Sequence, residues 1–520
     1  MDATSDLELS TFVFDNWDGG FSGSLIVRNT TDVVVENWQA ELSFPSGVTL
    51  EGGWNASFAP TDGGYSVTPD ASNAVIRVGE AVSIGVNLSD PANLVGSLDA
   101  RVFVADTDGG HDGAGTEDSG DDEDASPGDR STMDGLNYIL GTQSIGPAYG
   151  FTDDSELVET ALGIEEMGSN ILKIALSPSL YDLTDSAHLE YDYVGMLSQD
   201  PSFKRVLEMD FDHYFFWVER AGVFIDGDGL TEAEAQAEYQ VHRQLADYLL
   251  TTFEGTGKTF YIGSWEADWH LVNENWNWDV FRSDVPQDRI DGMIDWLNIR
   301  QQAIDDAKGV HGTDGVNLFH YVEVNLVETA MDGLPRIANE ILPHVNVDLV
   351  SYSAYDVTAD LDSYETMKLE LTATLDYLEQ QLQPKDGLPF EKRVFIGEFG
   401  YPFGRGEAWR NDPETAEEQA ARSLDFLRVS LEWGTPFALY WQFYDNEISS
   451  DGSYNGFWMV DNEGVEQPIY EIYEEFYDQS DAWVQAFVET NGRNPTEEEF
   501  RSKSVAVLTE MREEIGHSWG

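Results

Sequence analysis

The chain contains no cysteine among its 520 residues. Disulfide bonds, thiolate catalysis and zinc sites built on cysteine are therefore excluded. No run of about 18 apolar residues occurs, so we expect no membrane-spanning helix. The first residues, Met1 to Asp6, form neither a basic nor an apolar region. If the protein is exported, we expect its signal peptide to be missing from this sequence.

Basic residues are scarce: 27 Lys and Arg stand against 98 Asp and Glu, which gives a formal net charge of −71. Such a chain repels nucleic acid and anionic membranes, so we expect neither as a partner. In molar salt the Debye length falls to about 3 Å, which screens repulsion within the chain. We interpret the charge as adaptation to very salty surroundings. Disorder is disfavoured because apolar periodicity continues through most of the chain.

Residues 106–131 lack aromatic and β-branched aliphatic side chains and consist largely of Asp, Glu and Gly. Like charges extend such a segment and glycine loosens it, so it is typical of a mobile linker. The sequence therefore predicts one domain over residues 1–105 and a second over residues 132–520.

Before the linker, apolar residues recur with period two. Trp38, Ala40, Leu42 and Phe44 alternate with polar residues, and a second such run extends over residues 82–88. Turn signals rich in Asp and Gly separate these runs. About 100 residues of short alternating strands predict an all-β, immunoglobulin-like sandwich.

After the linker, short apolar strands alternate with helices. Thr231 and Glu234 form a capping box at one helix start, Asp412-Pro413 is expected to open another helix, and Gly434 to close it. The predicted strands are Gly135–Leu140, Asn170–Leu176, Tyr214–Val218, Thr259–Trp265, Asn317–Val322, Asp348–Ser353, Arg393–Ile396 and Phe437–Trp441. Eight strand–helix units predict a (β/α)₈ barrel. A doubly wound sheet is the alternative, but residues 140–146 lack the glycine-rich phosphate turn typical of that fold.

Two glutamates follow barrel strands in an aromatic setting. Glu266 lies in Trp265-Glu-Ala-Asp-Trp269, after the fourth strand, and Glu398 lies in Gly397-Glu-Phe-Gly400, after the seventh. In such barrels the C-terminal ends of the strands face the active site. In so acidic a chain, the alternative for any single glutamate is a solvated surface residue without a catalytic role. That alternative explains the pair of glutamates less well.

On these residues, the chain from about Asp134 to Tyr473 resembles the clan of retaining glycoside hydrolases typified by family 5 cellulases. The resemblance implies that Glu266 is the acid/base and Glu398 the nucleophile, with no metal and no cofactor. Tyr355 matches the clan's strand-six tyrosine, which hydrogen-bonds the nucleophile. Trp441 matches the strand-eight tryptophan beneath the cleaved sugar. Retaining hydrolysis needs the two carboxyls about 5–5.5 Å apart.

The clan usually places Asn directly before the acid/base, where this chain has Trp265. Asn325, beyond strand five, is the candidate to replace it, and we expect Trp265 and Asp268 to bind substrate as well. Glu274, in a literal Asn-Glu pair, is the alternative acid/base. Glu323 is a third candidate carboxylate, more in keeping with a supporting role.

Residues from Leu7 to about Ala105 resemble family 2 carbohydrate-binding modules, which bind crystalline cellulose and related β-glycans. The resemblance rests on Trp17 before Gly20-Phe21, on Asn37-Trp38, on Trp54-Asn55-Ala56 and on Gly79 before the strand of residues 82–86. It implies that Trp17 and Trp54 stack on sugar rings and that Trp38 belongs to the core. The family's third tryptophan position falls at Ser72 and is lost here.

Together these features predict a secreted, monomeric enzyme that hydrolyses β-1,4-glycosidic bonds, acting internally on cellulose and binding a β-glycan partner through its sandwich. Enzymes of the same clan that act on xylan, mannan or chitin are the first alternative. A glycan-binding protein without catalytic activity is the second, and the replacement of Asn by Trp265 favours it.

Overall fold

The computed structural model divides the chain into two compact units, residues 1–126 and 127–520. Each is described by itself. The described residues are 7–17, 20–29, 35–36, 38–43, 49–54, 56–61, 64–69, 75–76, 81–89, 99–104 and 136–515, the last range without 220–228, 273–284, 359–362, 404–412, 414 and 450–451. The predicted linker, residues 106–131, and Glu274 lie outside them.

The N-terminal unit is built from antiparallel β-strands, which confirms the all-β prediction. Its two four-stranded sheets have the orders β1-β2-β9-β5 and β10-β4-β7-β6, and β3 pairs with β8. Trp38 and Ala40, alternate residues of one strand, are fully buried, as are Val67 and Ile84. The strands are β1 (Leu7–Trp17), β2 (Gly20–Asn29), β3 (Val35–Glu36), β4 (Trp38–Ser43), β5 (Thr49–Trp54), β6 (Ala56–Thr61), β7 (Gly64–Pro69), β8 (Val75–Ile76), β9 (Ala81–Ser89) and β10 (Asp99–Val104).

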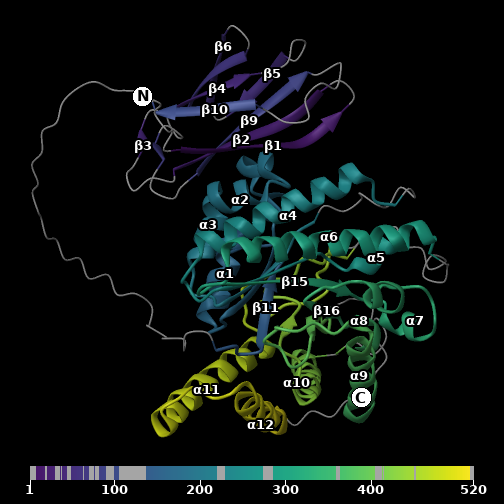
Figure 1. Cartoon of the computed structure of the whole chain (residues 1–520). Coiled ribbons are helices and arrows are strands. Elements are labelled where there is room, and N and C mark those ends of the chain that lie inside the picture. The colour runs from purple at the N-terminus through teal and green to yellow at the C-terminus, as the bar shows by residue number, and fades with distance from the viewer. Residues whose placement is uncertain are drawn as a thin grey trace, which may run out of the picture. The chain divides into compact units, whose positions relative to one another are not determined.

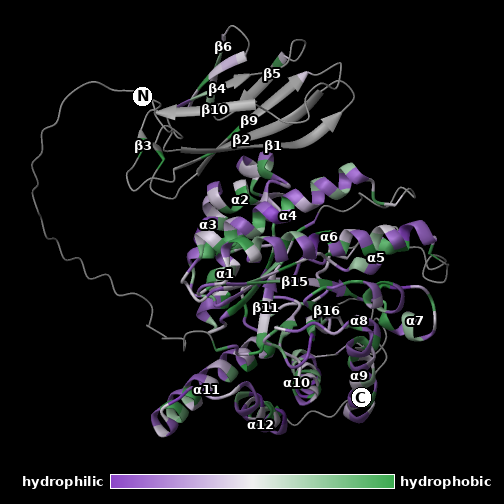
Figure 2. Ribbon diagram, viewed as in Figure 1, coloured by the Kyte–Doolittle hydropathy of each residue, from purple (hydrophilic) through white to green (hydrophobic). Residues whose placement is uncertain are grey.

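The C-terminal unit contains a closed barrel of eight parallel strands in sequential order, surrounded by helices (Figure 1), which confirms the predicted (β/α)₈ fold. Hydrophilic and hydrophobic residues alternate along these helices (Figure 2). The strands are β11 (Leu140–Ser144), β12 (Ile171–Ala175), β13 (His213–Trp217), β14 (Thr259–Gly263), β15 (Asn317–Val324), β16 (Leu349–Ser353), β17 (Val394–Phe399) and β18 (Ala438–Tyr440).

Helices connect the strands, and two long helices follow the last one. The α-helices are α1 (Glu156–Glu166), α2 (Tyr193–Gln199), α3 (Pro201–Glu208), α4 (Glu232–Thr252), α5 (Ala267–Leu271), α6 (Gln287–His311), α7 (Val327–Met331), α8 (Tyr355–Thr358), α9 (Tyr364–Gln381), α10 (Ala416–Trp433), α11 (Pro468–Asn491) and α12 (Glu497–Ile515). Short 3₁₀ or π turns are η1 (Pro178–Tyr181), η2 (Thr184–Leu189), η3 (Ile337–Ile341) and η4 (Leu342–His344). Within the described residues, no helix combines the length and the apolar character needed to cross a bilayer.

Two predicted boundaries are wrong. The first strand was expected over residues 135–140 but begins at Leu140, because Ile139 has a left-handed backbone (φ 67°) and its N–H is held by the Asn137 side chain. Polar residues follow in the strand itself. The helix expected to open at Asp412-Pro413 begins instead at Ala416, where the Thr415 hydroxyl caps the Glu418 N–H.

Other local predictions are confirmed. Thr231 and Glu234 form the capping box of α4. Gly434 ends α10 with φ 104°, a conformation that favours glycine. A third boundary also differs from the prediction: the seventh strand extends to Phe399, so Glu398 lies inside β17 and pairs with Ser353 of β16.

Aromatic side chains fill the barrel interior. Phe215 and Tyr261 stack with ring centroids 4.1 Å apart, and Phe395 and Phe437 pack against Phe215. These rings are buried in one cluster that extends to Trp217 and Trp441 near the strand ends. The interior is therefore a solid core beneath the C-terminal face, which leaves that face as the place for a site.

Candidate active site

Glu266 lies directly before helix α5, two residues beyond the Ser264 that follows β14. Its side chain is 8% exposed. The Trp269 indole N–H and the Asn325 amide (3.2 Å) both donate to its Oε2, and the Ser353 hydroxyl donates to Oε1 at 2.5 Å. Burial raises the pKa of Glu266 to about 7, while the hydrogen bond from Ser353 opposes that rise. Near neutral pH this carboxyl can both lose and accept a proton.

Glu398, 3% exposed, projects from β17 into the same region. The Lys173 ammonium lies 3.2 Å from its Oε1, and the Ser353 hydroxyl lies 3.4 Å from its Oε2. Burial raises the pKa of Glu398 well above its usual range; the Lys173 charge lowers it, and the charges of Glu323 and Glu266 raise it. Glu398 is thus one of three carboxyls around one cation.

The Ser353 hydroxyl joins the two catalytic candidates. It lies 2.5 Å from a Glu266 oxygen and 3.4 Å from a Glu398 oxygen, so those two oxygens are no farther apart than the sum of these distances. That limit is compatible with the spacing of about 5–5.5 Å used in retaining hydrolysis. Ser353 reaches both because a register shift between Tyr352 and Ser353 sets it opposite Glu398.

Lys173 and Glu323 form an ion pair at the floor of the site. The two side chains are fully buried, with Lys173 Nζ 2.8 Å from Glu323 Oε2, 3.1 Å from the Gly397 carbonyl oxygen and 4.7 Å from the centre of the Trp217 ring. The Ser351 hydroxyl also donates to Glu323 Oε2 at 2.7 Å. Glu323, which the sequence suggested as a supporting carboxylate, is therefore linked to Glu398 through the Lys173 ammonium.

Gly397 is required by this arrangement. A Cβ at this position would lie 1.6 Å from the Ser351 hydroxyl and 2.8 Å from Glu323 Oε2. Any side chain here would displace the groups that hold Lys173.

Three indole rings line the same end of the barrel. Trp217 lies 6.0 Å from Trp441 and 6.5 Å from Trp265, centroid to centroid. Trp441 follows β18 and is 7% exposed, whereas Trp265 is half-buried and its backbone N–H donates to Glu219 at 2.6 Å. The three rings form an apolar group at this end of the barrel, with Trp217 tilted by 30° to Trp441 and by 58° to Trp265.

Two expected substrate contacts have other partners. Asp268 is fully buried, and its carboxylate accepts the backbone N–H groups of Asn325, Leu326 and Ile337, so it holds the chain after β15. The Asn325 amide is brought beside Glu266. Asn325 thus lies beside the candidate acid/base, where we expect the residue that replaces the asparagine usual in the clan.

Tyr355 begins α8 and is half-buried near Glu398. Burial, followed by the charge of Glu398, raises the pKa of its hydroxyl well above the usual range. Its ring meets Phe457 edge-on at 6.0 Å. The structure thus brings Glu266, Glu398, Asn325, Tyr355 and Trp441 to one end of the barrel.

Sequence reasoning missed Lys173, Ser353 and Trp217. Lys173 had a signal: it is a lone basic residue in an apolar strand, Ile171-Leu-Lys-Ile-Ala175, of a chain poor in cations. Such a residue is buried with a partner or not buried at all. Ser353 and Trp217 offered no comparable signal.

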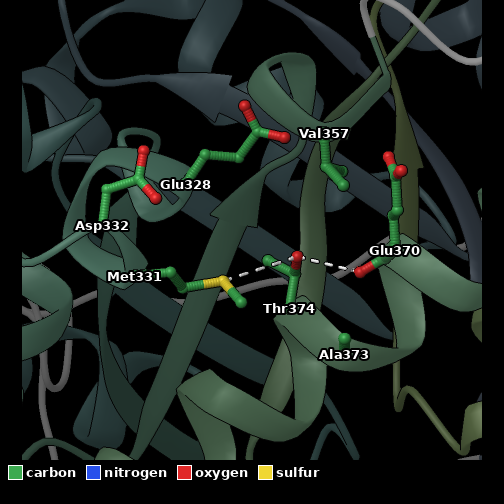
Figure 3. Close-up of a pocket in the computed structure, with 7 residues that line it drawn as sticks. All are labelled: Glu328, Met331, Asp332, Val357, Glu370, Ala373 and Thr374. Atoms are coloured by element: carbon green, nitrogen blue, oxygen red, sulfur yellow. Dashed lines mark hydrogen bonds between the residues drawn. The ribbon is translucent and has the colours of Figure 1, made fainter.

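The described residues contain no cluster of three or more His, Asp or Glu side chains suited to a metal ion. A surface pocket of about 330 Å³ lies apart from the site, between α7, α8 and α9 (Figure 3). Glu328, Asp332 and Glu370 line it, and none of the candidate catalytic residues does. Three carboxylates alone make no ligand site, and we assign it none.

The side chains of Trp17 and Trp54 lie outside the described residues, although their backbones end β1 and β5. Trp38 is fully buried, as expected of a core residue.

Residues 9–102 match the family model of the cellulose binding domain, CBM_2. Endoglucanase E-5 of Thermobifida fusca is 34% identical over 70 residues, which are 14% of this chain and 15% of that protein. Chitinase C of Streptomyces lividans is 30% identical over 78 residues, 15% of this chain and 13% of that protein. The shared part is thus a small fraction of these curated relatives.

Among solved structures, the chitin-binding domain of a Streptomyces coelicolor protein is 26% identical, covering 19% of this chain and 91% of its own, with a TM-score of 0.17. A β-glucuronidase of Bacteroides uniformis is 11% identical, covering 90% of this chain and 50% of its own, with a TM-score of 0.43. The N-terminal unit is therefore similar to cellulose-binding domains, and the barrel's chemistry has to be argued from its own side chains.

Proposed function

We propose that the barrel hydrolyses β-1,4-glycosidic bonds of a polysaccharide with retention of configuration, acting internally on cellulose, with Glu398 as nucleophile and Glu266 as acid/base. The observation that carries this proposal is the hydroxyl of Ser353 within hydrogen-bond distance of both carboxyls. Two carboxyls at that spacing, on the C-terminal face of a barrel and beside indole rings, match the requirements of the two-step reaction.

The contacts favour one assignment of the two catalytic roles. Two N–H groups, which cannot accept a proton, donate to Oε2 of Glu266, so a proton on this carboxyl belongs on Oε1, where the Ser353 hydroxyl can turn to accept it. Of the two candidates, Glu398 is the one in contact with the Lys173 ammonium, which it shares with Glu323 and which favours the ionised form of Glu398. Because two adjacent carboxyls do not readily ionise together, the proton that the pair retains is held by Glu266.

In the first step, Glu398 attacks the anomeric carbon while Glu266 gives its proton to the departing glycosidic oxygen. In the second, Glu266 removes a proton from water, the resulting hydroxide oxygen bonds to the anomeric carbon, and the Glu398–sugar bond breaks. Each glutamate ends in its starting protonation state. The ring of Trp441 would lie beneath the reacting sugar, with Asn325 and Trp265 nearby.

The N-terminal domain would hold the enzyme on its substrate through Trp17 and Trp54, with residues 106–131 as the linker, outside the cell and in salty surroundings. The names of the relatives include an endoglucanase, a chitinase and a xylanase, so this domain favours no single glycan. A barrel acting on chitin, xylan or mannan is the second candidate.

The test is the full-length Glu398→Gln variant, assayed for reducing sugar on cellulose, xylan, mannan and chitin in molar salt. We expect activity to fall by at least about 10⁴-fold on the substrate that the native enzyme cleaves, with an unchanged unfolding midpoint. Glu370→Gln, an exposed glutamate on α9, is the matched control and should keep full activity. The anomeric configuration of the first product, followed by NMR, checks retention. Persistent activity in Glu398→Gln, or an inverted product, would overturn the assignment.

A further inference from the structure

Five aromatic rings from two separate loops gather at one corner of the barrel's C-terminal face. Tyr149 and Phe151 belong to the loop after β11, and Tyr444, Tyr454 and Trp458 to the loop after β18. Tyr149 stacks on Tyr444 with centroids 5.0 Å apart, meets Tyr454 edge-on at 5.3 Å and lies 5.8 Å from Phe151. Tyr454 lies 6.1 Å from Trp458. We call these five residues the corner aromatic cluster.

The cluster is not closed over by the protein. Phe151 is 48% exposed, and two further apolar residues of the β18 loop, Ile448 and Val465, are 53% and 52% exposed. Ile448 pairs with Tyr454, and the Phe151 ring lies beside Gly464, next to Val465. The described residues include eight such exposed large apolar side chains, and three of them meet at this one corner. Apolar surface gathered in this way marks an interaction site.

Hydrogen bonds fix the backbone at Phe151. The Glu159 carboxylate accepts the N–H groups of Phe151 and Thr152, each at 2.7 Å, and the Tyr444 hydroxyl at 3.1 Å. The Tyr149 hydroxyl donates to the Val460 carbonyl at 2.6 Å and accepts the Asp445 N–H at 3.0 Å. One buried carboxylate and one phenol therefore tie the two loops together. Because the backbone beneath the ring is already fixed, less conformational freedom is lost when a ligand covers the ring.

The cluster lies on the face that carries the candidate catalytic residues. β11 and β18 are neighbours in the barrel, and Trp441 directly follows β18. Phe457, which precedes Trp458, packs in the same buried group as Trp441 and meets Tyr355 edge-on. The exposed ring of Phe151 offers a pyranose a flat apolar surface on which its C–H face can stack.

We propose that the corner aromatic cluster is a sugar subsite. It binds one pyranose unit of the glycan chain, away from the bond that is cleaved between Glu266 and Glu398. The inference rests on the proposed function. Phe151 supplies the stacking surface, and Glu159 and Tyr149 position it. A longer substrate reaches this subsite and a short one does not.

The test compares Phe151→Ala with the native full-length enzyme on soluble β-1,4-linked oligosaccharides of increasing length. We expect KM to rise about 3- to 10-fold for the long members and by clearly less for the shortest one hydrolysed, as the loss of one aromatic contact implies. Phe151→Trp, which keeps a ring, should restore the dependence on length. Leu369→Ala removes an exposed apolar side chain of α9 and is the control expected to leave every value unchanged.

Equal losses on short and long substrates, or no loss on any, would overturn the subsite. A change of sedimentation from dimer to monomer in Phe151→Ala would overturn it too, by showing that a second copy of the chain covers the cluster. If the native enzyme cleaves none of the oligosaccharides, the proposed function fails. The subsite is then tested by calorimetric binding of the longest oligosaccharide, with and without Phe151→Ala, in a chain carrying Trp17→Ala and Trp54→Ala.

Discussion

Removing either member of the buried Lys173–Glu323 pair should move the pH profile of hydrolysis, and the two removals should move it in opposite directions. Lys173 lies 3.2 Å from Glu398, and Glu323 lies on the other side of that ammonium, 2.8 Å away. The polar groups that face this region also include Gln143, Glu266, Tyr321, Ser351, Ser353 and Tyr355. In Lys173→Met, Glu398 loses its only cationic contact in the described part of the chain and keeps both like charges.

The magnitude follows from Coulomb's law. Two unit charges about 4 Å apart interact by about 4 kcal/mol at the effective dielectric constant of about 20 that suits protein sites. A change of one pKa unit corresponds to about 1.4 kcal/mol. If half of the interaction is lost to relaxation and to water that enters the space, the acidic limb of kcat/KM should still rise by at least about one pH unit. The sign is upward because the nucleophile must be ionised and its ionised form has lost its cation.

In Glu323→Gln a like charge disappears while Lys173 stays beside Glu398. The acidic limb should therefore move to lower pH. The basic limb, which reports the proton of Glu266, should move with it, because the charge of Glu323 raises the pKa of Glu266 and that of Lys173 lowers it. The assay is kcat/KM against pH in constant molar salt, with Lys173→Arg as the variant that keeps the charge. Shifts of the same sign in Lys173→Met and Glu323→Gln, or lowered activity with unmoved limbs, would refute the electrostatic reasoning.

Three further substitutions and one change of solvent test the remaining contacts. Ser353→Ala removes a hydrogen bond that lowers the pKa of Glu266, so the basic limb of the pH profile should move upward; an unmoved limb would contradict the bridge. Gly397→Ala should abolish hydrolysis and lower the unfolding midpoint, since its Cβ must displace Ser351 or Glu323, and a native-like crystal structure with full activity would disprove this. Arg300→Met removes the cation beside the buried Glu238 and the donor to the Val218 carbonyl, and should cost about 3–5 kcal/mol in urea unfolding, against less than about 1 kcal/mol for an exposed arginine such as Arg205. Raising KCl from 0.1 to 2 M should raise the thermal midpoint, because a net charge of −71 repels itself in dilute buffer; a falling midpoint would exclude that cause.

The sequence predicts the fold more completely than it predicts the candidate active site. Eight apolar segments at regular spacing predicted the barrel, and caps such as Thr231 with Glu234 are local enough to be recognised in the chain. The first strand failed because β11 carries polar side chains that bond inside the barrel: the Thr142 hydroxyl donates to the Tyr440 carbonyl, and the Gln143 amide donates to the Gly397 carbonyl. Partners 298 and 254 residues away leave no mark on local periodicity.

The same limit explains what was missed at the site. Strand ends led to Glu266 and Glu398 because position along a strand is a local property. Lys173 acquires its role only when closure of the barrel brings it to Glu323 and Glu398, 150 and 225 residues further on. Asp268 was placed in the substrate site by its position beside Glu266, yet it turns to three backbone N–H groups. Sequence position identified the end of the barrel, whereas side-chain direction required the structure.

The charge of this protein acts on two separate levels. On the surface, carboxylates far outnumber cations, and their repulsion weakens as salt shortens the Debye length to about 3 Å near 1 M. In the barrel, the distances that matter, 2.8 Å from Lys173 to Glu323 and 3.2 Å to Glu398, separate buried groups that mobile ions do not reach. A few buried cations can therefore set the protonation of the catalytic pair independently of the solution outside. Stability should follow the salt concentration, while the limbs of the pH profile should stay where the buried charges set them.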